Sequence, residues 1–327
     1  MLKFSKIFLL LVLTVQTAFG QKEVNSPYAR FGPGNLEAST SFRSMGMGGT
    51  GIAIRDSKYL FYQNPASYSS LDSNSFVFDF AFDYRIIELD DGIDTYQSDD
   101  INIHHIVMGF PLGKKAGFVT GVTPYSSGYY NLKTQVDVGD PGYDPIIGTT
   151  SETHNGEGGI SKFFFGAGVE VYKGLSLGAN MSFLFGTLDR ENRLSFLDDN
   201  NYFNNVYHEV LNIRGYNFDL GAQYNIDFGE NMFSTLGLKY TNKSDFKAES
   251  SSLLARHSVY TGTVYSVDTL AYSPETSINI TLPATLSFGM SFGIKDKLLV
   301  SADYSTTDWS KASFIGHESM FTKSQGF

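Results

Sequence analysis

The chain has 327 residues, a formal net charge of −10 and no cysteine. Without thiols it can form neither disulfides nor thiolate metal sites, and its acidic charge argues against nucleic acid as a partner. After the first 20 residues, no apolar run approaches the roughly 18 residues that a membrane-spanning helix requires. Abundant glycine and aromatic residues and sparse proline agree instead with a closed barrel of strands.

The first 20 residues have the pattern of a secretory signal peptide. Lys3 and Lys6 precede an apolar run from Ile7 to Val15, and Ala18-Phe19-Gly20 has the small-x-small form of a cleavage site. The run is too short for a transmembrane helix. We therefore expect export, a mature chain that begins at Gln21, and a mature net charge of about −12.

Residues 21–75 differ from the rest of the chain. They are rich in Ser, Gly, Asn and Ala, with no long alternation, and we interpret them as a small separate segment before the first strand. A glycine-rich stretch and an Asn-Pro-Ala stretch stand out: Gly46, Gly48, Gly49, Gly51 and Asn64, Pro65, Ala66. The glycines match a dinucleotide fingerprint by letter, but no strand precedes them and no helix follows. Tightly folded backbone is therefore the better interpretation.

Alternation over residues 76–86 predicts the first strand. One face is large and apolar: Phe76, Phe78, Phe80, Phe82, Tyr84 and Ile86. The other is small or charged: Val77, Asp79, Ala81, Asp83 and Arg85. A helix would spread those charges around its circumference, so the period indicates a strand. In a soluble sandwich the aromatic face would be the core, whereas in an outer-membrane barrel it would face lipid and the charges would line a wet lumen.

Eight more alternating segments follow: 106–112, 116–124, 158–172, 175–188, 212–227, 232–244, 281–294 and 298–310. Short turns alternate with long polar stretches at 125–156, 189–209 and 245–279, the last expected to contain a small hairpin. Bacterial barrels sort their loops in this way, with short periplasmic turns and long extracellular loops, whereas a sandwich has no reason to. We therefore predict an all-β fold, a transmembrane antiparallel β-barrel. Lumen-facing candidates are Asp79, Asp83, Arg85, Asp219 and Ser291.

Three patterns resemble functional sites and are given plainer interpretations. Gly289-x-Ser291-x-Gly293 has the letters of a hydrolase elbow but lies within an alternating strand, so no enzyme is expected. His104 and His105 would face opposite sides of a strand and could not chelate one ion, which leaves interfacial histidines near the outer rim. The acidic run 88–100 matches no calcium loop. We interpret it as a solvated extracellular loop, with bridging of divalent cations to lipid headgroups as the alternative.

Several stretches together resemble the FadL/TodX family of outer-membrane transport proteins, and its Bacteroidota-type members most closely. They are 45–53, Asn64-Pro65-Ala66, 122–126, 156–159 and the stretch from Asp303-Tyr304 to Trp309-Ser310. The resemblance implies a 14-stranded barrel plugged by an N-terminal hatch. It also implies passive passage of hydrophobic molecules, such as long-chain fatty acids or aromatic hydrocarbons, across the outer membrane. Gating by the hatch would then involve the glycines and Asn64, Pro65 and Ala66, with no cofactor and no metal.

The expected organisation is a signal peptide at 1–20, a hatch at 21–75 and a barrel at 76–327. Only about nine strands are evident and residues 318–327 alternate poorly, so we expect a truncated barrel. Two functions stay open. A channel for hydrophobic molecules should contain an apolar lumen patch large enough for an acyl chain. A scaffold subunit that docks proteins in a secretion or assembly complex would have a lumen filled by its own side chains. Outer-membrane lipids are expected around either.

Overall fold

The computed structural model describes residues 26–90, 92, 95–198, 202–260, 263–314 and 323–326. The strands are β1 (Asn35–Leu36), β2 (Val77–Asp90), β3 (Thr95–Pro111), β4 (Ala116–Ser127), β5 (Tyr130–Val136), β6 (Thr150–Tyr172), β7 (Leu175–Phe196), β8 (Asn204–Phe228), β9 (Met232–Thr241), β10 (Ser244–Tyr260), β11 (Thr263–Leu282), β12 (Thr285–Ile294), β13 (Leu298–Asp308) and β14 (Lys323–Gly326). The helical turns are η1 (Pro27–Arg30), α2 (Phe42–Met45), η2 (Pro65–Ser70) and η3 (Trp309–Lys311). No helix in these described ranges is long and apolar enough to cross a membrane.

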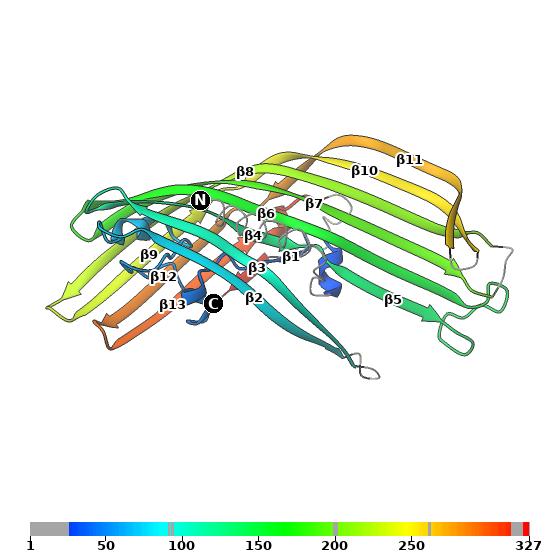
Figure 1. The fold of residues 1–327 in the computed structure, drawn as a ribbon, viewed down its shortest axis with the longest axis horizontal. Helices are drawn as coiled ribbons and strands as arrows, with labels where there is room; N and C mark the ends of the chain where they lie inside the picture. Colours follow the sequence, from blue (N-terminus) through cyan, green and yellow to red (C-terminus); the bar gives the residue numbers. More distant parts are fainter. Residues whose placement is uncertain are drawn as a thin grey trace, which may run out of the picture.

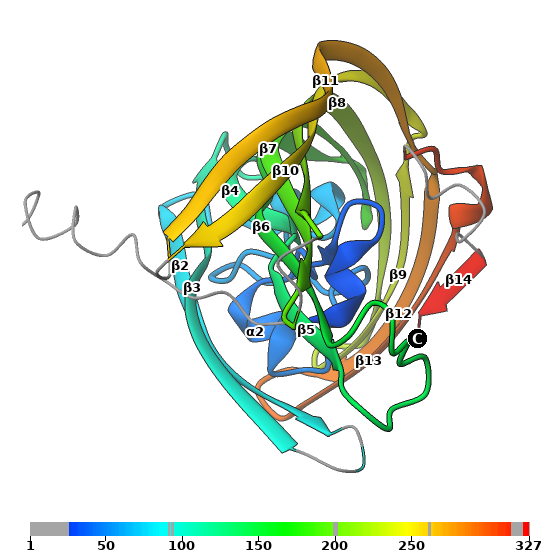
Figure 2. The same ribbon diagram turned by 90° about the vertical axis from the view of Figure 1, so that its right-hand side faces the viewer.

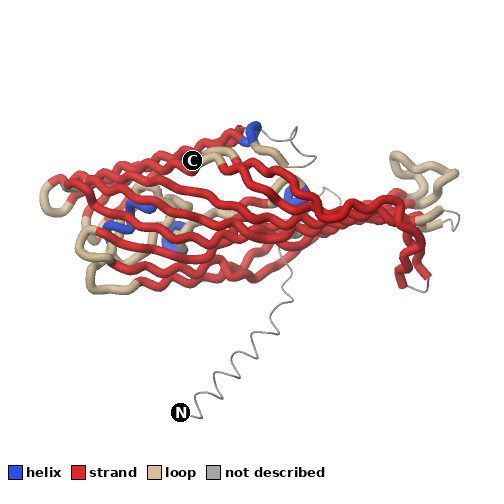
Figure 3. Tube along the Cα trace, turned by 90° about the horizontal axis from the view of Figure 1, so that it is seen from above, coloured by secondary structure: helices blue, strands red, loops and turns tan. Residues whose placement is uncertain are grey.

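All strands belong to one antiparallel sheet, whose main path runs β14-β13-β12-β9-β8-β7-β6-β4-β3-β2. The strands run along the length of the molecule (Figure 1), and the sheet curves around the N-terminal segment (Figure 2). Seen from above, the strands enclose the short helical turns of that segment (Figure 3). The predicted all-β barrel architecture is confirmed. The proposed signal peptide at 1–20 lies outside the described residues.

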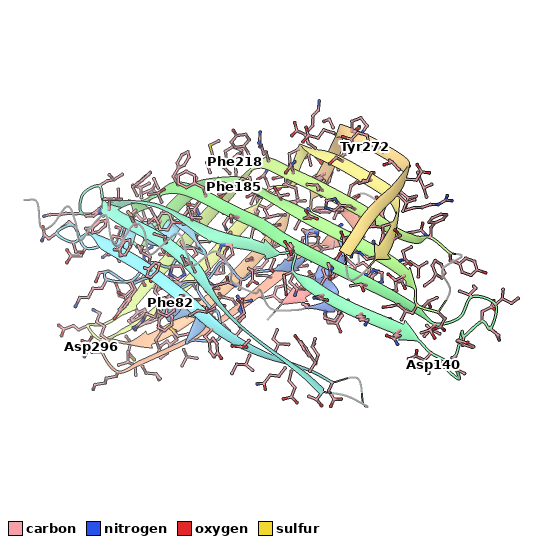
Figure 4. All side chains as sticks on the ribbon, turned by 45° about the vertical axis from the view of Figure 1, so that its right-hand side comes forward. Phe82, Asp140, Phe185, Phe218, Tyr272 and Asp296 are labelled. Atoms are coloured by element: carbon pink, nitrogen blue, oxygen red, sulfur yellow. The ribbon has the colours of Figure 1, made fainter. Side chains whose placement is uncertain are left out.

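The aromatic face of the first predicted strand points outward, away from the interior of the sheet. The large side chains from Phe76 to Ile86 are between 46% and 62% exposed, whereas Ala81 on the opposite face is buried. Figure 4 shows Phe82 of β2, Phe185 of β7 and Phe218 of β8 on the outside of the sheet. An exposed aromatic band around a polar interior is the arrangement of a barrel in lipid. The core therefore lies inside, between wall and N-terminal segment.

The strand count was too low. The nine predicted strands correspond to β2, β3, β4, β6, β7, β8, β9, β12 and β13, and the structure adds β1, β5, β10, β11 and β14. The polar stretches expected to be loops at 125–156 and 189–209 contain β5 and long parts of β6, β7 and β8. The small hairpin expected within 245–279 is instead the long hairpin β10–β11. Where water covers both faces of the sheet, a strand needs no alternating apolar side chains, although its backbone still pairs with its neighbours. These segments therefore lack the pattern by which a strand is recognised in the sequence.

The acidic run was also misassigned as a loop. Its described residues lie in β2 and β3, where Arg85 pairs with Asp100 and Glu88 with Gln97 across the ladder. Gly92 lies in a bend between the two strands, whereas Asp91 and Asp94 lie outside the described residues. Near the end of the chain, β14 pairs with Ser305–Asp308 of β13.

Candidate functional site: the hatch and the wall around it

We call residues 26–75 the hatch. Its glycine-rich stretch follows α2, and Gly48 and Gly49 adopt φ values of +72° and +83°, which side chains disfavour. A Cβ on Gly51 would overlap the Gln63 side chain. Gly46 differs, because its φ is −65° and a Cβ there would meet only backbone oxygens at 3.6 Å or more. Of the four predicted glycines, three therefore have a structural reason to be glycine.

The Asn-Pro-Ala stretch lies at the centre of the hatch. Asn64 caps η2 by accepting a hydrogen bond from the Ala66 amide at 3.1 Å, and Pro65 occupies the first helical position. The Asn64 amide group donates to Ile52 O of the hatch at 2.8 Å, and lies 3.3 Å from Ala222 O and Leu238 O of the wall. Asn64 is fully buried, so these contacts satisfy a side chain that water cannot reach.

The wall meets the hatch through a ring of small residues that we call the glycine belt. Its members are Gly117, Gly168, Gly178, Gly221, Gly237 and Gly289. The first four follow one another across β4, β6, β7 and β8 in register, and the last two face each other across β9 and β12. A Cβ at any of the six would overlap hatch atoms, mostly backbone between Ile52 and Tyr68. The belt therefore lets two backbones pack directly together.

Charged side chains of the wall hold the outer half of the hatch. Arg85 of β2 donates two hydrogen bonds to the Glu37 carboxylate, at 2.8 and 2.7 Å. Lys162 of β6 donates to the Ser39 hydroxyl at 2.8 Å, and Arg190 of β7 donates to Gly32 O. In addition, β1 of the hatch pairs with the end of β4.

Polar side chains of the wall also bind the hatch backbone deeper in the lumen. Asp303 of β13 accepts from the amides of Gly51 and Ile52 at 2.7 and 2.9 Å. Gln223 of β8 donates to Ile52 O at 2.8 Å, and Ser291 of β12 donates to Ala53 O at 2.8 Å. Contacts to the hatch therefore come from β2, β4, β6, β7, β8, β12 and β13, on several sides of the lumen.

The five predicted lumen residues all lie on the inner side of the wall. Arg85 and Ser291 contact the hatch as described, and Asp83 forms an ion pair with Arg85. Asp79 lies 3.2 Å from His105 of β3, and buried Asp219 lies 3.3 Å from the Lys239 ammonium group. Ser291 sits within β12, and its hydroxyl is engaged by the hatch carbonyl.

The interpretation of the two histidines was wrong. A bulge shifts the register so that Ala81 pairs with His105 while Phe82 pairs with Ile103, and His104 becomes the extra residue. Both rings therefore turn inward, with their Nδ1 atoms 2.8 Å apart and exposures of 3% and 1%. His105 packs edge-on against Tyr62 of the hatch and His104 packs against His105, so the pair lies in the interior instead of at the rim. Within the described ranges, no cluster of three possible metal ligands is found.

Buried phenols join the hatch to the rest of the core. Tyr62 donates its hydroxyl to Thr40 O at 2.5 Å, and Tyr68 donates to Asn180 Oδ1 of β7 at 3.0 Å. Burial raises the pKa of Tyr62 well above its usual value, with a further contribution from the Asp79 charge. Burial likewise raises the pKa of Tyr68. Both phenols stay neutral and can act as donors at physiological pH.

A cavity of about 570 Å³ remains between the hatch and the wall near η3. Leu36 and Ala38 of the hatch line one side, and Tyr125 and Trp309 of the wall contribute aromatic surface. Hydroxyl groups of β12 and β13 also line it, so its surface is mixed in polarity. A small ligand in this cavity would meet the aromatic side chains of Tyr125 and Trp309.

The sequence analysis missed most of the residues that hold the hatch. Arg190, Lys162, Gln223 and most of the glycine belt were not singled out, although Gly289 was named in the hydrolase-like pattern and Asp303 lay in a stretch that resembled the family. A usable signal existed, since glycines recur at inner-face positions of otherwise alternating strands, as Gly221 and Gly237 do. Such glycines mark places where another backbone approaches closely.

Comparison with known proteins agrees with this geometry. The chain is similar to a Pseudomonas aeruginosa FadL homologue of known crystal structure, with 12% identity and a TM-score of 0.51, covering 84% of this chain and 70% of that one. No curated protein matches it. The family model BamG matches residues 1–325. The chain therefore belongs to the BamG family and has the fold of a FadL-like outer-membrane β-barrel.

Proposed function

We propose that this protein is a docking subunit of an outer-membrane assembly complex, in which a plugged barrel anchors protein partners. The glycine belt carries the proposal, because the hatch fits the wall backbone against backbone. Displacing it would break about fifteen hydrogen bonds, on the order of 15 kcal/mol if each contributes about 1 kcal/mol. A plug held in this way is suited to a permanent seal. Membership of the BamG family supports a role beside other assembly proteins.

The lengths of the central strands support docking as well. β6, β7 and β8 have 23, 22 and 25 residues, whereas a transmembrane strand needs about 9–11 residues. About half of each strand therefore extends beyond the membrane, with β5 and the β10–β11 hairpin alongside (Figure 1). The extension projects from the rim opposite the short turns. This is the extracellular rim if the short turns are periplasmic. A transport channel does not need such a broad extension.

An engineered cross-link tests the proposal. The Ser69 hydroxyl of the hatch lies 2.8 Å from that of Ser176 in β7, so Ser69→Cys with Ser176→Cys should form a disulfide that fixes the hatch to the wall. Ser287→Cys with Ser305→Cys is the matched control, since those hydroxyls also lie 2.8 Å apart but join two wall strands. The chain contains no other cysteine.

We expect both oxidised variants to support assembly of outer-membrane proteins as the unmodified chain does. Both should also co-purify with the same partners from native membranes. If oxidation of the hatch pair alone abolishes function, and reduction restores it, then hatch movement is required and the docking proposal is wrong.

Passive uptake of hydrophobic molecules is the second candidate, and the 570 Å³ cavity beside Tyr125 and Trp309 favours it. In this alternative the hatch would act as a gate around Asn64 and Pro65. Asn64→Ala with Pro65→Ala should then alter uptake of a labelled long-chain fatty acid while leaving barrel insertion intact. Unchanged uptake in that variant would exclude gating by the Asn-Pro-Ala stretch.

A further inference from the structure

The β10–β11 hairpin stands apart from the barrel wall. β11 pairs with β10 along its length, and β10 pairs in turn with β8 from Ala248 to His257. Figure 2 shows the hairpin running from the top of the barrel mouth to its left side, in front of β4 and β7. Both faces of β11 are exposed from residue 267 to residue 277, and Figure 4 shows Tyr272 at the outside of the molecule. β11 is therefore an edge strand surrounded by water.

The second edge of β11 is open over most of its length. Among the described residues it pairs only at Thr281, which exchanges two backbone hydrogen bonds of 3.1 Å with Ser313. That short pairing shows that an extended chain fits along this edge. Between residues 267 and 280, the described part of the chain supplies no further strand. Within the described residues, the outward-pointing backbone donors and acceptors of this stretch have no strand partner.

Residues 267–273 of the open stretch contain neither lysine nor proline, although they include Asp268 and their register against β10 shifts at Val267 and at Leu270. Natural edge strands are protected by charged residues, above all lysine, by proline, by bulges, or by being very short. The same residues expose Val267, Leu270 and Tyr272 by 47%, 43% and 67%. Pro274 follows this stretch. An exposed sheet edge with apolar side chains beside it is typical of strand addition by a binding partner.

We propose that β11 binds an extended, positively charged strand of a protein partner, which pairs with its open edge over residues 267–273. The proposal rests on the docking function above and identifies a surface for it. The charge follows from β11 itself, whose only charged residues are the exposed Asp268 and Glu275. Arg256, which faces Asp268 across the hairpin, stacks on the Phe203 ring. Lysine or arginine on an incoming strand would complement this edge.

A second copy of the chain fits the edge less well. Antiparallel self-pairing centred on Ala271 and Tyr272 would keep residues 267–276 paired, but it would place Asp268 opposite Glu275. Like charges directly opposite each other destabilise an antiparallel pair. The charge pattern therefore favours a basic strand from another protein.

Hydrogen exchange of the β11 amides tests the inference in the full chain. We expect residues 267–273 to exchange about tenfold more slowly in the complex isolated from native membranes than in the separated chain. As a defined probe, a ten-residue peptide of alternating lysine and valine should slow the same amides in the separated chain. A glutamate–valine peptide should not. Asp268→Lys with Glu275→Lys should remove both effects, whereas Asp227→Lys with Glu230→Lys at the opposite rim should retain them.

Equal exchange of residues 267–273 in the complex and in the separated chain would overturn the inference. Because the partners would still co-purify, that result would leave the docking function standing. Equal protection by the two peptides would overturn the assignment of a basic partner. In the self-paired register Ala271 of one copy lies opposite Tyr272 of the other, so an Ala271→Cys with Tyr272→Cys variant that forms disulfide-linked dimers in the native membrane would identify a second copy as the occupant instead.

Discussion

The Asp303 carboxylate lies 2.7 Å from the Gly51 amide and 2.9 Å from the next one, so β13 holds the loop that follows Gly48 and Gly49. Two residues separated by most of the sequence thereby fix where the hatch sits in the barrel. Neighbouring wall groups repeat the arrangement with other hatch carbonyls and amides. The position of the hatch is consequently set by directional bonds as well as by shape.

Replacing Asp303 should loosen this loop without unfolding the wall. Asp303→Ala leaves two buried amides without an acceptor, which costs about 1–3 kcal/mol per group. We expect faster proteolysis of the hatch and a lower temperature for the heat-induced mobility shift in gels. Glu230→Ala, in an exposed turn, is the control and should change neither. A hatch that stays equally resistant in Asp303→Ala would show that the carboxylate has no holding role.

Two glycines allow a direct test of the belt. Gly178→Ala places a methyl group against Pro65 of the hatch, and overpacking of this kind costs typically about 1–3 kcal/mol. Gly46→Ala lies within the hatch itself but meets only ordinary contacts in a helical conformation, so it should be neutral or slightly stabilising. Thermal unfolding in detergent should separate the two variants. Equal melting temperatures would contradict the belt as a packing interface.

Buried tyrosines predict how the hatch responds to alkaline pH. The pKa values of Tyr62 and Tyr68 are raised in the folded state, so the folded hatch favours the neutral phenols. This stability is fully present below the unfolded pKa of about 10 and is lost as pH rises through the folded values. The resistance of the hatch to proteolysis should therefore fall above about pH 10. Tyr62→Phe should weaken that fall, which pH-dependent proteolysis and tyrosinate absorbance can measure.

Sequence patterns predicted the wall well because lipid imposes a strict alternation on it. Phe76 to Ile86 must face lipid at every second position, so one strand already indicated the fold class. The extension beyond the membrane was missed for the same reason. At residues such as Thr153 and Arg193, water bathes the sheet and no alternation is required. The prediction for the two histidines was wrong because His104 is an extra residue in its strand. The side-chain pattern does not reveal the β-bulge that this residue forms.

The contacts of the hatch could be predicted only in part. Glycine clusters and the Asn64-Pro65-Ala66 stretch indicated tightly packed backbone from the sequence alone. Their partners could not be identified, because contacts such as Lys162 with Ser39 join residues that only the folded barrel brings together. Register across several strands decides which glycines line up, as Gly178 and Gly221 do. One sequence without its relatives does not fix that register.

Removal of the hatch should show whether the hatch acts as a permanent seal or as a gate that opens. The hatch fills the lumen through the belt, so deletion of residues 21–71 should leave a wall with an open pore lined by Asp79, Arg85, Asp219 and Ser291. We expect the intact protein in planar bilayers to be closed to small ions, and the deleted form to conduct steadily. Added long-chain fatty acid should not open the intact protein if the hatch is a permanent seal.

These conductance measurements distinguish the two functions because transport requires the hatch to move and docking does not. A docking subunit needs its hatch for stability only. If the wall of the deletion variant inserts into the membrane, the variant should therefore still co-purify with its protein partners from native membranes. An uptake channel needs a hatch that moves, so intact protein should respond to fatty acid, and the Ser69–Ser176 disulfide should abolish that response. Fatty-acid-dependent conductance that oxidation of this pair blocks would favour transport over docking.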